Sequence, residues 1–167
     1  YAVYTLAQWL VLVVAARLTD LATVGRLGLA LALCAPVAML TNLGLRVGQA
    51  TDARRAFDFG SYFALRLLGG ATTLVVVGFL ASWFWRQGHA ASATIVLLVG
   101  ACKAVESQSD VVYGLFQQRE RMDLMARSLM LRGVLGLAAL TGLTYATGRI
   151  EAGLAGQAAA WTFALAA

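Results

Sequence analysis

The chain has 167 residues, of which 60% are hydrophobic and 13% are charged, and its mean hydropathy is +0.76. This excess of apolar residues excludes an ordinary soluble domain and predicts a polytopic membrane protein. The net charge of +5 comes from basic residues that cluster between hydrophobic runs. It therefore indicates orientation in a lipid bilayer, and we do not expect a nucleic-acid partner.

Six hydrophobic segments follow one another and predict an all-α transmembrane bundle of about six helices. The segments cover residues 1–16, 26–45, 60–84, 90–114, 124–147 and 152–167. A helix needs about 20 apolar residues to cross about 30 Å of hydrocarbon. The middle four segments meet this length, and we expect the first and last to be truncated parts of a longer protein. The continuous runs differ from the short alternating strands of an outer-membrane barrel.

The arginines in the loops predict the orientation of the bundle. The second and fourth loops carry six arginines, against four in the odd-numbered loops. Because loops rich in Arg and Lys stay in the cytoplasm, we predict that the second and fourth loops and the N-terminus are cytoplasmic.

The fourth segment carries ionisable residues where lipid contact would be costly. Lys103, Glu106 and Asp110 are followed by Tyr113 and Gln117 at spacings of three and four, which places all five on one helical face. A charge at the helix centre costs about 2.5 to 3.5 kcal/mol even on a permissive scale. The face is therefore predicted to point into the bundle. It either lines a transport path or holds charges that neutralise one another, because Lys103 and Glu106 are i,i+3 neighbours.

Further arginines lie inside or beside the predicted helices. Arg132 would be about 13 Å deep if its helix begins near residue 123, and Arg66 lies several residues inside the third segment. Arg46 and Asn42 end the second segment on the same predicted side. Guanidinium groups match phosphate geometry, so these residues are candidate ligands of a phosphate-bearing amphiphile. Each arginine could instead be a cytoplasmic anchor, and snorkelling accounts well for Arg127.

Neither the histidine nor the cysteines suggest an active site. His89 is the single histidine and falls in a predicted outer loop, and no nucleotide-binding, zinc-protease or serine-hydrolase motif is present. Cys34 and Cys102 lie in apolar runs, where we expect them to be buried packing residues. The sequence therefore predicts a protein that is not an enzyme, with no metal and no cofactor.

Two stretches carry a resemblance to a known family. They are "VGRLGLALALCAPVAMLTNLGLRVGQATD" at 24–52 and "ACKAVESQSDVVYGLFQQRERMDLMARSLMLRG" at 101–133. Together with "ARLTDLATVGRLGLA", which joins the first two segments, they resemble the bacterial polysaccharide (O-antigen-type) flippases. This family belongs to the superfamily of multidrug, oligosaccharidyl-lipid and polysaccharide exporters. The resemblance covers nearly all of the chain, and no single residue is diagnostic.

The resemblance implies a protein of 12 to 14 helices in two lobes, with residues 1–167 forming most of the N-terminal lobe. It implies transport of an oligosaccharide on undecaprenyl pyrophosphate across the bacterial inner (plasma) membrane, for lipopolysaccharide or another surface polysaccharide. The partners would be the C-terminal lobe of the same chain and the polysaccharide polymerase machinery. Arg66, Lys103 and Arg132 match cavity cations by position, and Glu106 and Asp110 match acidic residues that could bind a coupling ion.

Other functions also fit the residue pattern. A cation- or proton-coupled drug or metabolite exporter would use Glu106 or Asp110 as its ion site. A non-transporting scaffold subunit would bind a partner helix through the same polar faces. A membrane enzyme of polyprenyl-phosphate chemistry fits less well, because it would need a tight cluster of acids, histidines or metal ligands near an interface.

Overall fold

The computed structural model describes residues 2–51 and 58–166, and within these ranges it is all-α, as predicted. The described residues form seven helices. Six correspond to the predicted segments, and the seventh, a short helix, lies almost entirely in the predicted second loop. The helices are α1 (Ala2–Leu18), α2 (Leu21–Asn42), α3 (Leu45–Thr51), α4 (Phe59–Arg86), α5 (Ala90–Gln118), α6 (Met122–Thr147) and α7 (Ile150–Ala166).

The bounds of several helices differ from the predicted ones, and local capping explains one case. α2 begins at Leu21 instead of 26, because the Asp20 carboxylate accepts a hydrogen bond from the Thr23 backbone N–H and caps the helix. Arg26 therefore lies inside α2 and not in a loop. α5 continues to Gln118 instead of ending at 114, and α6 begins at Met122 instead of 124.

A break between α2 and α3 replaces the continuous end of the second predicted segment. Leu43 and Gly44 have φ angles of 49° and 61°, in the left-handed region that an α-helix cannot contain. Gly44 adopts this conformation without a Cβ penalty, whereas Leu43 is an uncommon residue there. α3 therefore starts as a separate short helix beside α5.

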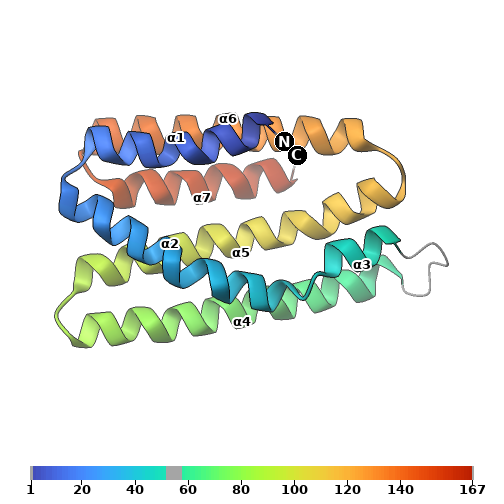
Figure 1. The fold of residues 1–167 in the computed structure, drawn as a ribbon, viewed down its shortest axis with the longest axis horizontal. Coiled ribbons are helices and arrows are strands. Elements are labelled where there is room, and N and C mark those ends of the chain that lie inside the picture. Colours follow the sequence, from blue (N-terminus) through green and yellow to red (C-terminus); the bar gives the residue numbers. More distant parts are fainter. Residues whose placement is uncertain (1, 52–57, 167) are drawn as a thin grey trace.

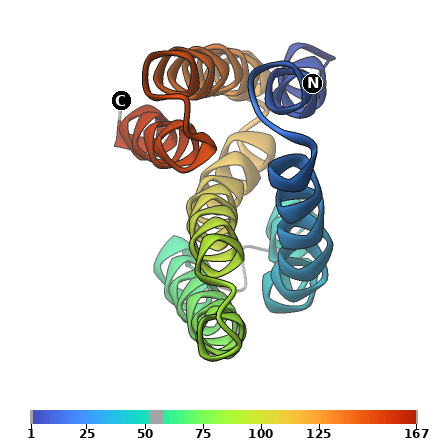
Figure 2. The same ribbon diagram turned by 90° about the vertical axis from the view of Figure 1, so that its left-hand side faces the viewer.

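α5 is the central helix of the bundle. It contacts α2, α3 and α4 on one side and α6 and α7 on the other, and Figure 2 shows it extending between these two groups. α1 packs on α6 and makes few contacts with α2. In Figure 1, α1 and α2 diverge toward the end that carries α3 and the α5–α6 turn.

The two ends of the bundle differ in their chemistry. At the end that holds the α4–α5 turn, an apolar core joins α1, α2, α4, α5, α6 and α7, with Leu27, Val77 and Ile95 almost completely buried. Cys34 belongs to this core, and both Cys34 and Cys102 are free and buried, as predicted. The opposite end contains most of the buried ionic groups described below.

The outer surfaces of the helices suit lipid contact. Within the described residues, four helical stretches are long and apolar enough to cross a membrane: Leu21–Gln49, Phe59–Arg86, Ala90–Gln118 and Met122–Thr147. On α4, the large side chains of Leu68, Val75 and Phe79 are all about two-thirds exposed. Such an apolar surface is stable against hydrocarbon and would be a liability in water.

The N-terminus of α4 is capped by Asp58, and the hydrogen bonds from the Ser61 hydroxyl and backbone N–H lower the pKa of its carboxyl.

Candidate functional site

Two cavities lie against α5 where α1 and α2 diverge. One has a volume of about 220 Å³ and is lined by α1, α2, α5 and α7. The other has a volume of about 240 Å³ and is lined by α2 and α5. Lys103 lines both cavities, so we describe them together as the groove. Its polar lining residues are Gln8, Asn42, Lys103, Glu106, Ser107, Asp110 and Gln157.

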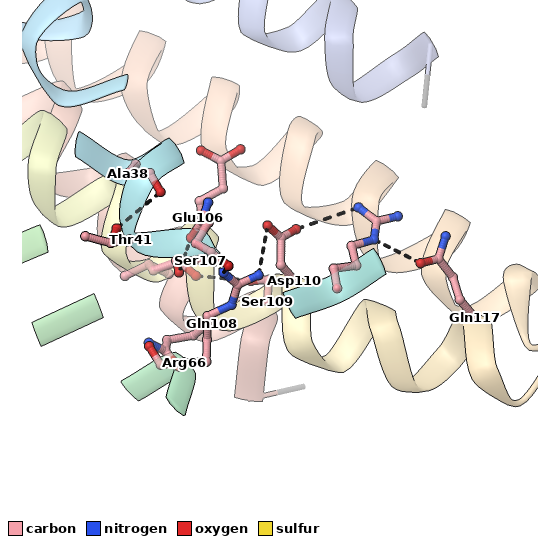
Figure 3. A network of polar contacts seen from close by, with 12 residues as sticks. Ala38, Thr41, Arg66, Glu106, Ser107, Gln108, Ser109, Asp110 and Gln117 are labelled. Carbon is pink, nitrogen blue, oxygen red and sulfur yellow. Dashed lines mark hydrogen bonds and ion pairs between the residues drawn. The ribbon is translucent and has the colours of Figure 1, made fainter. Parts of the chain in front are cut away.

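Asp110 is bound by two arginines from other helices (Figure 3). The Arg66 side chain, on α4, is 1% exposed, and its Nη2 lies 3.5 Å from Asp110 Oδ2. Arg66 Nη1 donates to the Asn42 carbonyl at 3.1 Å and to Asn42 Oδ1 at 2.7 Å. Arg66 thus satisfies a carbonyl at the end of α2, where the helix stops and its last C=O groups lose their intrahelical partners.

Arg46, the second residue of α3, approaches Asp110 from the other side. Its Nη1 lies 3.7 Å from Asp110 Oδ1, and its Nε donates to Gln117 Oε1 at 3.0 Å. Its guanidinium also lies 5.9 Å from the centre of the Tyr113 ring, and Nη2 contacts Met125 Sδ at 3.4 Å. Arg46 therefore connects α3 with α5 and α6.

Glu106 lies one helical turn from Asp110 and has different partners. Lys103 Nζ donates to Glu106 Oε2 at 2.7 Å within the same helix. The Tyr4 hydroxyl, from α1, donates to Glu106 Oε1 at 2.7 Å, and Gln8 Nε2 donates to that hydroxyl at 2.8 Å. Lys103 and Glu106 are each about a quarter exposed, so this pair remains open to the groove.

Arg132 lies behind the groove in an aromatic cage. It is 2% exposed, and its guanidinium carbon is 4.2 Å from the centre of the Trp161 ring and 5.6 Å from that of Tyr4. Its Nε and Nη2 atoms have no hydrogen-bond partner among the described residues. A buried guanidinium stacked on two rings gains cation–π energy, and here it also supports Tyr4, the donor to Glu106.

The predicted site residues thus fall into three groups. Asn42, Arg46, Arg66 and Asp110 form one connected cluster, and Lys103 and Glu106 form a second. Arg132 lines neither cavity of the groove, but its guanidinium stacks on Trp161, which lines one of them. Tyr4, Gln8 and Trp161 were missed by the sequence reasoning, although the i,i+4 spacing of Tyr4 and Gln8 in an apolar helix was a detectable signal.

The arrangement gives a polar, positively charged surface inside an apolar bundle. Three cationic side chains, Arg46, Arg66 and Lys103, face two carboxylates, so the formal charges sum to +1, and Arg132 adds a further positive charge against Tyr4 and Trp161. Such a surface can attract a phosphate or carboxylate, and the amides of the groove can exchange hydrogen bonds with hydroxyl groups. Within residues 2–51 and 58–166, no group of three His, Cys, Asp or Glu residues is placed to hold a metal ion.

The fold and the groove define a class: an α-helical chain with several candidate membrane spans and with charged groups held inside the bundle. The chain is 28% identical over 132 residues to the capsular polysaccharide biosynthesis protein CapF of Staphylococcus aureus. The match covers 79% of this chain and 32% of CapF, so the chain spans about a third of the length of this curated relative. No protein-family model matches the chain, and no solved structure matches it.

Proposed function

We propose that this chain is part of a transporter that moves a lipid-linked oligosaccharide across the bacterial plasma membrane during the biosynthesis of a surface polysaccharide. The groove carries the proposal, because it combines positive charge and amide groups with helices that are long and apolar enough to span a bilayer. The similarity to CapF, whose name refers to capsular polysaccharide biosynthesis, supports the substrate class.

Lys103 is the residue that we assign to direct contact with the pyrophosphate or with an acidic sugar. It lines both cavities, and its partner Glu106 lies on the same helix, so a substrate anion can replace that partner without separating helices. Arg46 is the second candidate, because its side chain is 23% exposed. Arg66 and Arg132 are buried, and we propose that they contribute positive potential from behind the groove.

The position of the groove suits entry from the cytoplasm. In Figure 1 the start of α1, the end of α2 and the α5–α6 turn lie at the same end of the bundle. Asn42 and Asp110, which line one cavity of the groove, are the last residue of α2 and a residue near the end of α5. The arginine distribution predicts that this end is cytoplasmic. The other cavity of the groove is walled partly by the apolar core, which fills the bundle toward the opposite end. In an alternating-access cycle, a second lobe in the remainder of the full-length protein would cover the groove and then release the substrate outward.

An ion-coupled exporter of drugs or metabolites is the second candidate function. Glu106 favours it, because this carboxylate is partly exposed to the groove and is bonded to the Tyr4 hydroxyl and to Lys103. In this scheme Glu106, or Asp110 between its two arginines, would bind the coupling ion. Loss of a proton-driven drug flux in Glu106→Gln, with oligosaccharide transport absent from the parent protein, would favour this candidate.

The test is a flipping assay with the full-length protein in liposomes. Transport is measured as the rate at which a lipid-linked oligosaccharide becomes accessible to a membrane-impermeant glycosidase. We expect Lys103→Gln to lower this rate at least tenfold, about the effect of losing one charge-assisted contact of 1.4 kcal/mol. Arg86→Gln is the matched control, because Arg86 is exposed at the opposite end of the bundle.

Two results would contradict the proposal. A parent protein that is folded but transports no lipid-linked oligosaccharide would favour the exporter or a scaffold subunit. If Lys103→Gln transported the oligosaccharide at the same rate as the parent protein and the Arg86→Gln control, Lys103 would not contact the substrate.

A further inference from the structure

A second, separate cavity lies between α5, α6 and α7. Its volume is about 460 Å³, within the range of about 300 to 1,000 Å³ that is usual for small-molecule sites. It shares no lining residue with the groove. The lining residues are Val112, Phe116, Leu124, Leu131, Ala164 and Leu165, together with the polar Ser109, Tyr113, Arg127 and Ser128.

The walls of the cavity are mostly apolar, and its one charged lining residue, Arg127, lies near the start of α6. Arg127 is exposed and forms no hydrogen bond or ion pair with the residues that the structure describes. The other polar groups satisfy one another or the backbone: Tyr113 and Ser128 share a hydrogen bond of 3.1 Å, and Ser109 donates to the Val105 carbonyl. Arg127 is therefore the charged group of this cavity that can meet an external anion.

The lining residues of the cavity lie at distances from the α5–α6 turn that fall within the depth of one leaflet of a bilayer. Arg127 lies five residues after the start of α6, which is about 8 Å along the helix axis, and Ser109 lies nine residues before the end of α5, about 14 Å. One leaflet contributes about 15 Å of hydrocarbon. A flexible arginine stem can bring its guanidinium back to the headgroup level from this depth.

We propose that this cavity binds one acyl chain of an anionic phospholipid, whose phosphate contacts Arg127. The apolar walls on α5, α6 and α7 fit the chain, and the unpaired guanidinium near the interface fits the negative headgroup. The lipid fills the space between α5 and α6, which contact each other much less closely than α4 contacts α5. This site is independent of the groove and of the transported substrate.

Native mass spectrometry of the full-length protein in detergent tests the headgroup contact. The probes are dioleoyl phosphatidylglycerol and dioleoyl phosphatidylcholine, added at equal concentrations. We expect the parent protein to retain phosphatidylglycerol in preference to phosphatidylcholine. In Arg127→Gln the ratio of the two retained lipids should fall about fivefold, the effect of one arginine near an anionic surface. Arg149→Gln removes an exposed arginine at the other end of α6 and should leave the preference unchanged.

A second variant tests occupancy of the cavity itself. Val112→Trp places an indole in the cavity and should abolish retention of the lipid, whereas Val134→Trp, at a 57% exposed position on α6, should not. Equal retention of both lipids by the parent protein, or an unchanged preference in Arg127→Gln, would overturn the proposal. Retention that survives Val112→Trp would also overturn it, because the lipid would then be bound at another place on the protein.

Discussion

Glu106 and Asp110 are two carboxylates on the same face of α5, one helical turn apart, and they are neutralised in opposite ways. Asp110 is bound by Arg66 and Arg46, which come from α4 and α3. Glu106 is bound by Lys103 of its own helix and by the Tyr4 hydroxyl. The first arrangement joins separate helices through charges, whereas the second is mostly local.

Because of this difference, we expect the two carboxylates to have different roles, one in stability and one in ligand exchange. Removing an arginine from Asp110 would disconnect helices, and the buried Arg66 would lose its counter-charge. Lys103 can leave Glu106 without any helix moving, because both residues belong to α5. We therefore expect Asp110 to hold the bundle together and the pair of Lys103 and Glu106 to exchange with a ligand. The four variants below test this comparison through the free energy of unfolding of the full-length protein in detergent.

Asp110→Leu should have the largest effect. It leaves Arg66 buried without a counter-charge, and we expect a loss of about 3 kcal/mol. The double variant Arg66→Met with Asp110→Leu should recover most of that loss, because it removes both charges from the interior. Asp123→Asn, in an exposed pair with Arg121, is the control and should change stability by less than about 0.5 kcal/mol. Equal losses in the single and double variants would show that Asp110 does not act through Arg66.

Gly69→Ala should destabilise the same region by about 2 kcal/mol. A Cβ at Gly69 would lie 2.6 Å from the Thr41 carbonyl oxygen, so α2 and α4 would have to separate next to the contact between Arg66 and Asn42. Gly78→Ala on the same helix meets no atom within 4 Å and should be neutral or stabilising by up to about 1 kcal/mol. If both alanine variants behaved alike, the close approach of α2 and α4 would not be needed for stability.

Tyr4→Phe tests the interhelical part of the Glu106 arrangement. It removes the hydroxyl that donates to Glu106 and accepts from Gln8, and we expect a loss of about 1.5 kcal/mol. The ring remains, so the stacking with Arg132 is retained. Tyr145→Phe, at a position that is 80% exposed, should have almost no effect. A loss as large as that of Asp110→Leu would make Glu106 an interhelical anchor as well.

Lys103→Gln should have the smallest effect on stability, about 0.5 kcal/mol, because it removes one i,i+3 pair within a helix. The same variant is expected to lower transport strongly, so stability and transport should separate at this residue. A loss of stability of several kcal/mol would place Lys103 with the structural cations and would contradict its proposed contact with the substrate.

Part of this site was predictable from local sequence features. The spacing of Lys103, Glu106 and Asp110 predicts a shared face because an α-helix repeats every 3.6 residues. The i,i+3 spacing of Lys103 and Glu106 also indicated that they could pair, and the structure shows this ion pair. The partners of Asp110 were not predictable as partners, because Arg66 lies 44 residues away and joins the carboxylate only when α4 packs on α5.

For Arg132 too, one property was predictable from the local sequence and another depended on how the helices pack. Its distance from the start of the helix could be counted in the sequence, and the structure shows that its side chain is buried inside the bundle. Its aromatic cage did not follow, because Tyr4 and Trp161 come from α1 and α7, near the two ends of the chain. The contact between Tyr4 and Glu106 likewise joins residues 102 positions apart.

The sequence by itself determined the all-α class, the helical segments and the face of α5 that carries the charges. These properties depend on composition and on periodicity, which act over a few residues. Only the tertiary structure decided that Asp110 is neutralised by Arg66 and Arg46, that the second segment breaks at Leu43 and Gly44, and that α1 and α2 diverge to leave a groove. Those features depend on which helices pack together, and packing joins residues that no local pattern connects.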